Sequence, residues 1–354
     1  MQKTTVAVIG CGRIAASAHV PAYAGNPLAE LKYLVDIREE RAAALARQYG
    51  VPHVAADYRV VLEDPAVEAV SICTPNDTHA PIAIACLEAG KHVLCEKPAA
   101  VSLDLVRQMK AAADRCGRIL NIGVVNRFNT QVNRIKEIIS SGELGDLYHI
   151  YCSFRAHRSI PGLGGPFTTQ AQSGGGVLID WGVHFLDLIF YCAGSPAVKT
   201  VSGATHSVLG RDMQDYAFLD MWAGPPDYSG VYDVEDFVTG LIRTQGPTIS
   251  LNGAWAQNIG EAAMFIDFLG SKAGIKLQYG GDFTIYSARD GVLYESKPAM
   301  RKVDMFAAEI DAFLRAARAG EKNRAHIDNV LITSAVMDAI YRSARLGAEV
   351  SLSE

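Results

Sequence analysis

The sequence lacks the features that mark several classes of protein. Among its 354 residues no run of lysine and arginine is long enough to form a basic patch, and the formal net charge is −5. Nucleic acid and anionic membranes are therefore not expected partners. No uninterrupted apolar stretch is long enough to span a bilayer. Residues 4–9 and 16–18 imitate a secretion signal, but Arg13 breaks the apolar stretch, and the glycines at positions 10 and 12 are better explained by a tight turn. We therefore expect a cytoplasmic protein.

The cysteines do not form a recognisable framework. There are 7 of them, an odd number, and none are spaced C-x-x-C. Most lie in apolar runs such as residues 70–73 and 92–95, which is typical of small buried side chains in a reducing compartment rather than disulfides or zinc ligands. With 354 residues, the chain is long enough for two domains of roughly 150 residues each.

Residues 1–123 alternate between short apolar runs and helical segments. Glycines at positions 50, 90 and 117 end three of the helices. This alternation predicts an N-terminal Rossmann domain, a doubly wound parallel sheet with helices on both faces. Strands are predicted at residues 6–9, 31–35, 67–73, 92–95 and 119–122, with helices from residue 13 and at 39–49, 80–89 and 102–116.

Residues 124–354 follow a different pattern, in which strands with short connections dominate. We expect an α+β domain with a large, mostly antiparallel, open-faced sheet and C-terminal helices that pack back on the first domain. A sheet face without helices is a natural surface for a homodimer or homotetramer. Strands are predicted at residues 146–155, 201–204, 217–222, 237–244, 248–256, 264–269, 275–279 and 283–287, and helices at 128–140, 174–192, 305–318 and 327–345.

The turn at residues 10–15, Gly-Cys-Gly-Arg-Ile-Ala, follows a buried strand directly and leads into a helix. That context makes the glycine pattern a dinucleotide-binding motif. The first glycine permits the tight turn, and the second lets the backbone approach a pyrophosphate. The helix N-terminus supplies free N–H groups for the phosphates. The residues predicted to bind the cofactor here are Gly10, Gly12, Arg13 and Ile14.

Asp36 stands at the end of the second predicted strand, 24 residues after Gly12. A carboxylate at this position accepts hydrogen bonds from the adenosine ribose and repels a 2′-phosphate, which favours NAD over NADP. Arg38 leaves NADP possible, because a nearby arginine can pair with that phosphate.

Two further strands end in polar residues, Thr74-Pro75-Asn76 with His79 and then Glu96-Lys97-Pro98. Ligands of such sheets bind beyond the carboxyl ends of the strands. A lysine there can bind a substrate hydroxyl oxygen and help to move its proton. The spacing alone fits a surface lysine in a turn equally well.

A third polar group lies after Gly174-Gly175-Gly176. Asp180, His184 and Asp187 fall within about 60° of each other on a helix, and histidine can accept a proton near neutral pH. A simply solvated helix face is the alternative. We predict that Asp187 has a structural role. The H-x-x-x-D type of spacing could suggest a metal, but no third ligand is evident.

Together these motifs resemble the Gfo/Idh/MocA family of glucose-fructose oxidoreductases and inositol dehydrogenases. The resemblance extends over the whole chain, through residues 142–145 and 174–187 to the C-terminal helices. It implies catalytic roles for Lys97, Asp180 and His184, no metal, and a cis peptide bond before Pro98. It also implies cofactor contacts by the strand-end residues Thr74, Pro75, Asn76, His79, Glu96 and Lys97.

We therefore expect reversible oxidation of a secondary hydroxyl of a sugar, glycoside or cyclitol, with hydride transfer to the nicotinamide. His184 would take the hydroxyl proton and Lys97 would hold the same oxygen, or these roles would be exchanged. The alternatives are a glycoside 3-dehydrogenase or glycosidase that recycles a tightly held NAD, and a non-catalytic NAD sensor. Candidates for binding other substrate hydroxyls are Asn126, Arg127, Arg155, His157 and Arg158.

Overall fold

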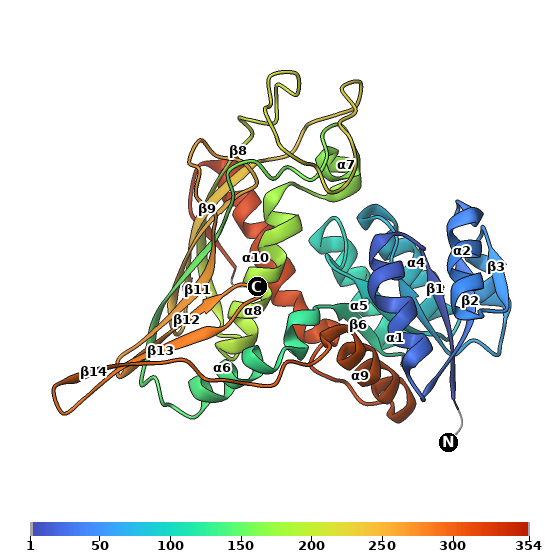
Figure 1. Cartoon of the computed structure of the whole chain (residues 1–354), viewed down its shortest axis with the longest axis horizontal. Coiled ribbons are helices and arrows are strands. Elements are labelled where there is room, and N and C mark those ends of the chain that lie inside the picture. Colours follow the sequence, from blue (N-terminus) through green and yellow to red (C-terminus); the bar gives the residue numbers. More distant parts are fainter. Residues whose placement is uncertain (1–2, 353–354) are drawn as a thin grey trace. The chain divides into compact units, whose positions relative to one another are not determined.

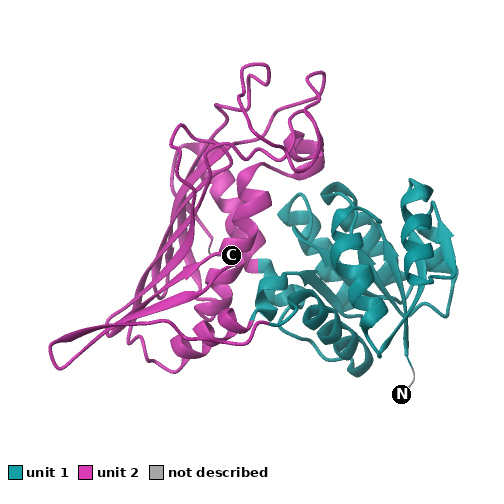
Figure 2. Cartoon of the chain, viewed as in Figure 1, with its two compact units in different colours: residues 1–129, 303–331 teal, residues 130–302, 332–354 magenta. Residues whose placement is uncertain are grey.

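A computed structural model describes residues 3–352 of the chain. The chain divides into two compact units (Figure 2). Unit 1 is Met1–Asn129 with Val303–Leu331, and unit 2 is Thr130–Lys302 with Ile332–Glu354. The division falls six residues after the expected boundary at residue 123, and part of the C-terminal helical region belongs to unit 1.

Unit 1 is built on a six-stranded sheet in the order β3-β2-β1-β4-β5-β6. Every pairing in it is parallel, which confirms the predicted Rossmann fold class. The strands are β1 (Thr4–Ile9), β2 (Ala29–Val35), β3 (His53–Ala55), β4 (Ala69–Ile72), β5 (His92–Glu96) and β6 (Leu120–Gly123). The helices are η1 (Ala15–His19), α1 (Val20–Gly25), α2 (Glu39–Tyr49), α3 (Arg59–Glu63), α4 (Asn76–Glu88), α5 (Leu103–Cys116), η2 (Val125–Phe128) and α9 (Met305–Ala319).

The local sequence explains where several of these helices begin and end. The Ser102 hydroxyl accepts the Leu105 N–H at the start of α5, and Gly117 ends the helix in the left-handed conformation at φ 60°. Gly50 ends α2 in the same way, at φ 69°. At the start of α9, the Asp304 carboxylate accepts the N–H groups of Phe306 and Ala307. Each of these contacts satisfies backbone groups that a helix end leaves unpaired.

Helix α9 completes unit 1 although it begins at Met305, 182 positions after β6 ends at Gly123. Its side chains Ile310, Phe313 and Leu314 are fully buried, in one cluster with Val6 and Val8 of β1. Unit 1 therefore buries one face of its first strand with a helix that the chain supplies near its C-terminus.

Unit 2 is built on a nine-stranded sheet in the order β14-β13-β12-β11-β7-β10-β9-β8-β15. The pairing of β7 with β10 is parallel and the other pairings are antiparallel, so the sheet is mostly antiparallel as predicted. The strands are β7 (Leu147–Arg155), β8 (Val198–His206), β9 (Phe237–Thr244), β10 (Thr248–Ala254), β11 (Ala263–Gly270), β12 (Ala273–Gln278), β13 (Phe283–Arg289), β14 (Val292–Ser296) and β15 (Val350–Ser351).

Helices α6 (Thr130–Ser140), α8 (Val183–Cys192) and α10 (Ile327–Leu346) lie along one face of this sheet (Figure 1). The other helical segments of the unit are η3 (Pro166–Thr168), α7 (Gln170–Ser173) and η4 (Leu178–Gly182), which leads into α8. The stretch Gln170–Cys192 has the length and composition of a membrane span, but 83% of its apolar window is buried inside the protein. That burial is what the central helix of a folded core requires.

The predicted strand at residues 217–222 is wrong, because this segment is irregular. Its apolar residues do not form one face: Met221 is buried at 8% exposure, whereas Leu219 is fully exposed. The sequence Gly-Pro-Pro-Asp follows at residues 224–227, and it is irregular as well. Apolar character without a paired neighbour is thus not enough to make a strand. The sequence pattern also did not predict the short strand β3 or the exposed edge strand β14.

Candidate functional site

The turn at the end of β1 has the shape that a bound dinucleotide requires. Gly10 is at φ 90°, and a Cβ there would lie 2.6 Å from the Cys73 carbonyl oxygen. A Cβ on Gly12 would instead meet nothing within 4 Å, so the backbone is open to a ligand. Arg13 is exposed and Ile14 half-buried. The small, fully buried Ala15 lets the following helix pack on the sheet. These residues fit a pyrophosphate at this turn.

Asp36 lies directly after β2 and is hydrogen-bonded to the same turn. Its Oδ2 atom accepts the Cys11 N–H at 2.7 Å, and its Oδ1 atom accepts the Arg38 N–H at 2.8 Å. These bonds fix the carboxylate beside the glycine turn, where it can accept bonds from ribose hydroxyls. Arg38 is exposed at the start of α2. The geometry fits NAD, and a 2′-phosphate would meet the Asp36 charge.

The loops after β4 and β5 are joined by His79. Its Nε2 atom lies 2.8 Å from the Thr74 carbonyl oxygen, and its Nδ1 atom lies 2.8 Å from the Pro98 carbonyl oxygen. The side chain is buried, and burial lowers its pKa despite these two contacts. Both ring nitrogens face the protein's own carbonyl groups, so His79 supports the loops. This revises the expectation that it touches the cofactor. Pro75 is exposed, and Thr74 and Asn76 are half-buried.

Lys97 follows β5, and its backbone is held by the preceding side chain. The Lys97 N–H donates to Glu96 Oε2 at 3.1 Å, and the Lys97-Pro98 peptide bond is cis. Glu96 Oε1 lies 2.8 Å from His19 Nε2. The Glu96 side chain is 9% exposed and that of His19 is 0% exposed. Glu96 is therefore bonded to groups of the protein itself, Lys97 N–H and His19, which revises its expected contact with the cofactor.

The buried pair extends further into unit 1. His19 Nδ1 lies 3.2 Å from the Ser71 hydroxyl, which lies 2.7 Å from the Tyr23 hydroxyl. A Cβ on Gly123 would lie 3.0 Å from the Glu96 carboxyl group, so a larger residue there would press on that group. Burial would raise the pKa of Glu96, but the hydrogen bond and charge of His19 and the charge of Lys97 bring it below its ordinary value.

In unit 2, Asp180 and His184 lie four residues apart on the helical stretch formed by η4 and α8. Both side chains are half-buried. The fully buried Trp255 donates its indole N–H to Asp180 Oδ2 at 3.2 Å, which sets the direction of that carboxylate. The His184 ring lies 6.2 Å from the Tyr279 ring, measured between centroids. The sequence reading missed Trp255 and Tyr279, because each lies in an apolar strand region and has no motif of its own.

Asp187 is placed differently from Asp180 and His184. It is 2% exposed, and its Oδ1 atom accepts a hydrogen bond from the Thr333 hydroxyl at 3.4 Å. This contact ties α8 to α10 inside unit 2, the kind of structural role that was predicted. Among residues 3–352, no three His, Cys, Asp or Glu side chains come together as a metal site would require.

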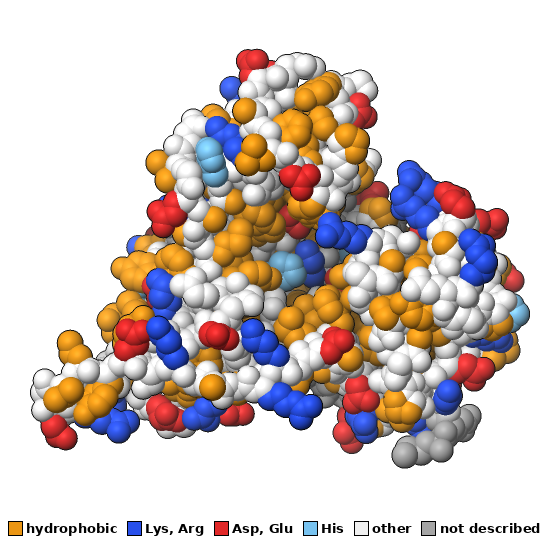
Figure 3. Space-filling view, in the orientation of Figure 1, with side chains coloured by type: hydrophobic (Ala, Val, Ile, Leu, Met, Phe, Trp, Pro, Cys, Tyr) orange, Lys and Arg blue, Asp and Glu red, His pale blue; other side chains and the backbone are white. Residues whose placement is uncertain are grey.

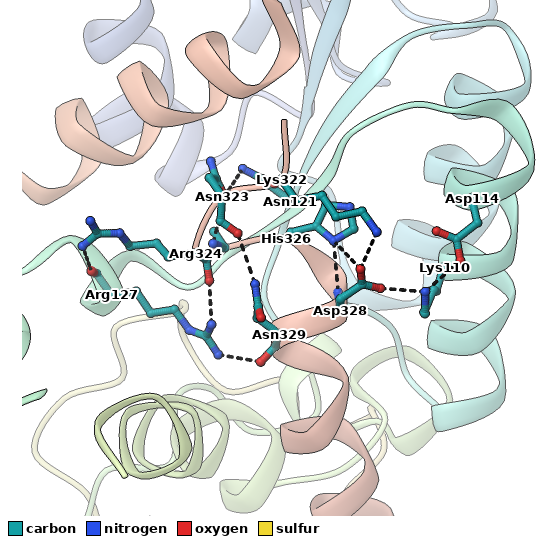
Figure 4. A network of polar contacts seen from close by, with 11 residues as sticks. Lys110, Asp114, Asn121, Arg127, Lys322, Asn323, Arg324, His326, Asp328 and Asn329 are labelled. Carbon is teal, nitrogen blue, oxygen red and sulfur yellow. Dashed lines mark hydrogen bonds and ion pairs between the residues drawn. The ribbon is translucent and has the colours of Figure 1, made fainter. Parts of the chain in front are cut away.

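Arg127 belongs to a buried polar network of unit 1 (Figure 4). It is 2% exposed and donates to the carbonyl oxygens of Arg324 at 2.6 Å and Asn329 at 2.9 Å. Arg324 donates in return to the Arg127 carbonyl oxygen at 3.2 Å. These bonds attach η2 to the segment before α10 and to the first turn of α10, so Arg127 has a structural role in place of the expected substrate contact. Asn126 beside it is half-buried.

The remaining substrate candidates lie at and after the end of β7. Phe154 packs on Phe185 of α8, with ring centroids 5.1 Å apart, so strand alternation places Arg155 on the opposite face of the sheet. Arg158 donates to the Gln257 carbonyl oxygen at 2.6 Å, and His157 is exposed. Arg155 therefore lies away from the helix that carries His184, which corrects its expected role.

Comparison with known proteins gives the class. Residues 4–124 match the family model described as an oxidoreductase family with an NAD-binding Rossmann fold, and residues 132–276 match the GFO/IDH/MocA C-terminal domain. The fold and the glycine turn thus define an NAD-binding oxidoreductase.

The chain belongs to the Gfo/Idh/MocA family. It is 32% identical to D-glucoside 3-dehydrogenase of Escherichia coli K12, over 98% of this chain and 97% of that protein. It is 30% identical to myo-inositol 2-dehydrogenase of Thermotoga maritima, over 53% of this chain and 54% of that one. Levoglucosan dehydrogenase, in a structure with NADH and levoglucosan, has a TM-score of 0.86 at 22% identity over 100% of both chains.

Proposed function

We propose that this protein oxidises a secondary hydroxyl of a glucoside, at carbon 3 of the sugar ring, with NAD as the acceptor. The observation that carries the proposal is the pair Asp180 and His184, which lie one helical turn apart with Asp180 fixed by Trp255. A carboxylate and an imidazole in this arrangement suit removal of a hydroxyl proton. The similarity to a glucoside 3-dehydrogenase over 98% of the chain supports the choice of substrate.

We assign the catalytic roles as follows. His184 accepts the proton of the reacting hydroxyl, Lys97 holds the oxygen as negative charge develops on it, and Asp180 orients the substrate or His184. The roles of Lys97 and His184 can be exchanged. A bound nicotinamide would supply the acceptor for the hydride of the carbinol carbon. Gly10, Gly12 and Asp36 would hold the dinucleotide.

A substrate panel tests this proposal. Methyl β-D-glucoside, glucose, levoglucosan and myo-inositol are each incubated with NAD, NADH is followed by its absorbance, and the keto product is located by NMR. We expect the highest kcat/KM with the glucoside and a 3-keto product. Conversion of the glucoside without net NADH would indicate that the cofactor is recycled. No turnover of any of the four compounds would contradict the proposal.

We also propose that the protein is a homodimer or homotetramer that uses the open face of the unit 2 sheet. Half-buried Phe265 and Leu269 and the 50% exposed Tyr151 share that face by register. Hydrophobic side chains also gather on the β13–β14 hairpin (Figure 3), where Leu293 is 86% exposed. Association would remove this apolar surface from water. Light scattering at micromolar concentration tests this, and a monomer would contradict it.

The seven cysteines are all free thiols, which supports our proposal that the protein works in the cytoplasm. Fractionation of cells that express the protein tests this. Recovery from an extracytoplasmic fraction would contradict it.

A further inference from the structure

The helical stretch that carries Asp180 and His184 begins against one buried acidic residue. Glu235 is 7% exposed. Its Oε2 atom accepts the Gly176 N–H at 2.9 Å, its Oε1 atom accepts the Leu178 N–H at 3.0 Å, and its carbonyl oxygen accepts the Val177 N–H at 3.2 Å. Three successive N–H groups at the N-terminus of the stretch are thus bonded to a single residue. These are the groups that a helix cannot satisfy itself.

A second side chain holds the carboxylate in place. The Tyr341 hydroxyl of α10 donates to Glu235 Oε1 at 2.9 Å. A Cβ on Gly175 would lie 2.1 Å from the Tyr341 hydroxyl, and one on Gly176 would lie 1.9 Å from the Glu235 carbonyl oxygen. The glycines that precede the helix are therefore required for close approach to these two residues.

The hydrogen bonds lead directly to one of the proposed catalytic residues. Gly176 donates its N–H to Glu235, and its carbonyl oxygen accepts the Asp180 N–H at 3.0 Å. His184 follows one turn later on the same face. A shift of the first helical turn would therefore displace both side chains, although the Trp255 indole N–H also donates to Asp180.

We propose that Glu235, held by Tyr341, is a positioning residue that fixes the start of the helix and thereby sets the places of Asp180 and His184. Glu235 touches neither cofactor nor substrate in this role and acts through the helix. The inference rests on the proposed function of those two residues. The proposal adds Glu235 to the residues on which that function depends. Glu235 lies at the end of the long loop between β8 and β9, 57 positions after Leu178.

The variant Glu235→Gln tests this with little change of shape. The amide oxygen of glutamine can replace one carboxylate oxygen, but its NH2 group would then face the N–H of Gly176 or Leu178 and cannot accept a hydrogen bond from it. We expect kcat to fall about 10- to 100-fold, since small misplacements of catalytic groups have effects of this size. The Kd for NADH should stay unchanged, because unit 1 carries the dinucleotide turn, and KM for the glucoside should change less than kcat.

Asp236→Asn is the matched control. Asp236 is adjacent in sequence and 1% exposed, and its carboxylate also accepts backbone N–H groups, at 3.0 Å from Val208, 2.6 Å from Leu209 and 2.8 Å from Gly210. These belong to a loop and not to the catalytic helix. We expect a comparable loss in Tm with kcat of the folded protein nearly unchanged. An equal loss of kcat in both variants would overturn the inference.

A double-mutant cycle separates positioning from general destabilisation. If Glu235 acts through His184, then Glu235→Gln should have a much smaller effect on kcat in a His184→Ala background than in the wild type. The same factor in both backgrounds would overturn the inference. Wild-type turnover by His184→Ala itself would instead contradict the proposed function. If Glu235→Gln does not fold, Tyr341→Phe serves in its place, and wild-type kcat in that variant would overturn the inference.

Discussion

The two units present their functional side chains on different structural elements but hold them with the same type of group. In unit 1, Lys97 stands in a loop at the end of a parallel strand, and its N–H donates to the buried carboxylate of Glu96. In unit 2, Asp180 and His184 stand on a helix whose first N–H groups donate to the buried carboxylate of Glu235. In both units a buried carboxylate accepts backbone N–H groups and so fixes the backbone from which the functional side chains extend.

The two carboxylates differ in what else surrounds them. Glu96 faces the imidazole of His19 at 2.8 Å and adjoins Lys97, and its pKa is lowered even though burial opposes this. Glu235 has the neutral hydroxyl of Tyr341 and backbone N–H groups as partners. Burial raises its pKa, and the hydrogen bonds only partly offset this. Both carboxylates thus hold a backbone segment in place, although the pKa of Glu96 is lowered and that of Glu235 is raised.

The largest expected effects come from the catalytic candidates of either unit. Lys97→Ala and His184→Ala should each lower kcat at least about 100-fold, because proton transfer and charge stabilisation each contribute on this scale. NADH affinity, measured by fluorescence titration, should remain. Lys91→Ala is the control, because Lys91 precedes the same strand β5 at its other end and donates to the Asp64 carbonyl oxygen at 2.7 Å. Near-normal turnover in both catalytic variants would exclude the mechanism.

Cofactor choice should depend on unit 1 alone. Asp36→Ser removes the carboxylate that would repel a 2′-phosphate, so the ratio of kcat/KM for NAD to that for NADP should fall about 10- to 100-fold. Glu235→Gln should leave this ratio unchanged. Steady-state kinetics with both cofactors measure it. A wild-type preference for NADP would contradict the role given to Asp36.

Breaking the buried pair in unit 1 should affect both stability and rate. Glu96→Gln leaves His19 without its carboxylate partner, and the loss of one member of such a pair costs about 3–5 kcal/mol. We also expect kcat to fall about 10-fold, because the Lys97 backbone loses its acceptor. Urea unfolding and steady-state kinetics measure the two effects.

The control for this variant is Glu68→Gln. The exposed Glu68 accepts the Thr5 N–H at 3.0 Å near the amino ends of the strands, away from Lys97. It should change kcat very little. An unchanged kcat in Glu96→Gln would show that the buried pair serves stability alone.

The smallest expected effects are opposite pH dependences of stability. Glu96 has a lowered pKa in the folded state, so its contribution is present above its ordinary pKa of 4.5 and is lost as the pH falls through the folded value. Glu235 has a raised pKa, so its contribution is present below 4.5 and is lost as the pH rises through the folded value.

This contrast is tested by measuring the unfolding free energies of the wild type and the two Gln variants between about pH 3 and pH 7. The difference between wild type and Glu96→Gln should grow with rising pH, and that between wild type and Glu235→Gln should shrink. Parallel slopes would show that the two carboxylates do not differ as described.

Short-range signals made much of this molecule predictable. The glycine turn after β1, the Ser102 cap and the glycine at position 117 act within a few residues of the chain, and the structure has each in the expected element. The resemblance also indicated Lys97, Asp180 and His184, because these lie in compact motifs.

Tertiary pairing was not predictable in this way. His19 and Glu96 are 77 positions apart, and Glu235 and Gly176 are 59 positions apart. In neither pair does a sequence motif around one residue indicate the other residue as its partner. Arg127 and Arg155 are candidate substrate ligands by sequence because they are charged residues near the domain junction. Burial of Arg127 and strand alternation at Arg155 decide otherwise, and both depend on the folded structure.

Direct transfer of hydrogen from the sugar tests the central claim most directly. Methyl β-D-glucoside with deuterium at carbon 3 is incubated with the enzyme and NAD, and the reduced cofactor is examined by mass spectrometry and NMR. The account predicts one deuterium at C4 of the nicotinamide and a 3-keto glucoside in equal amount. Reduced cofactor without deuterium, or oxidation at another carbon, would contradict it.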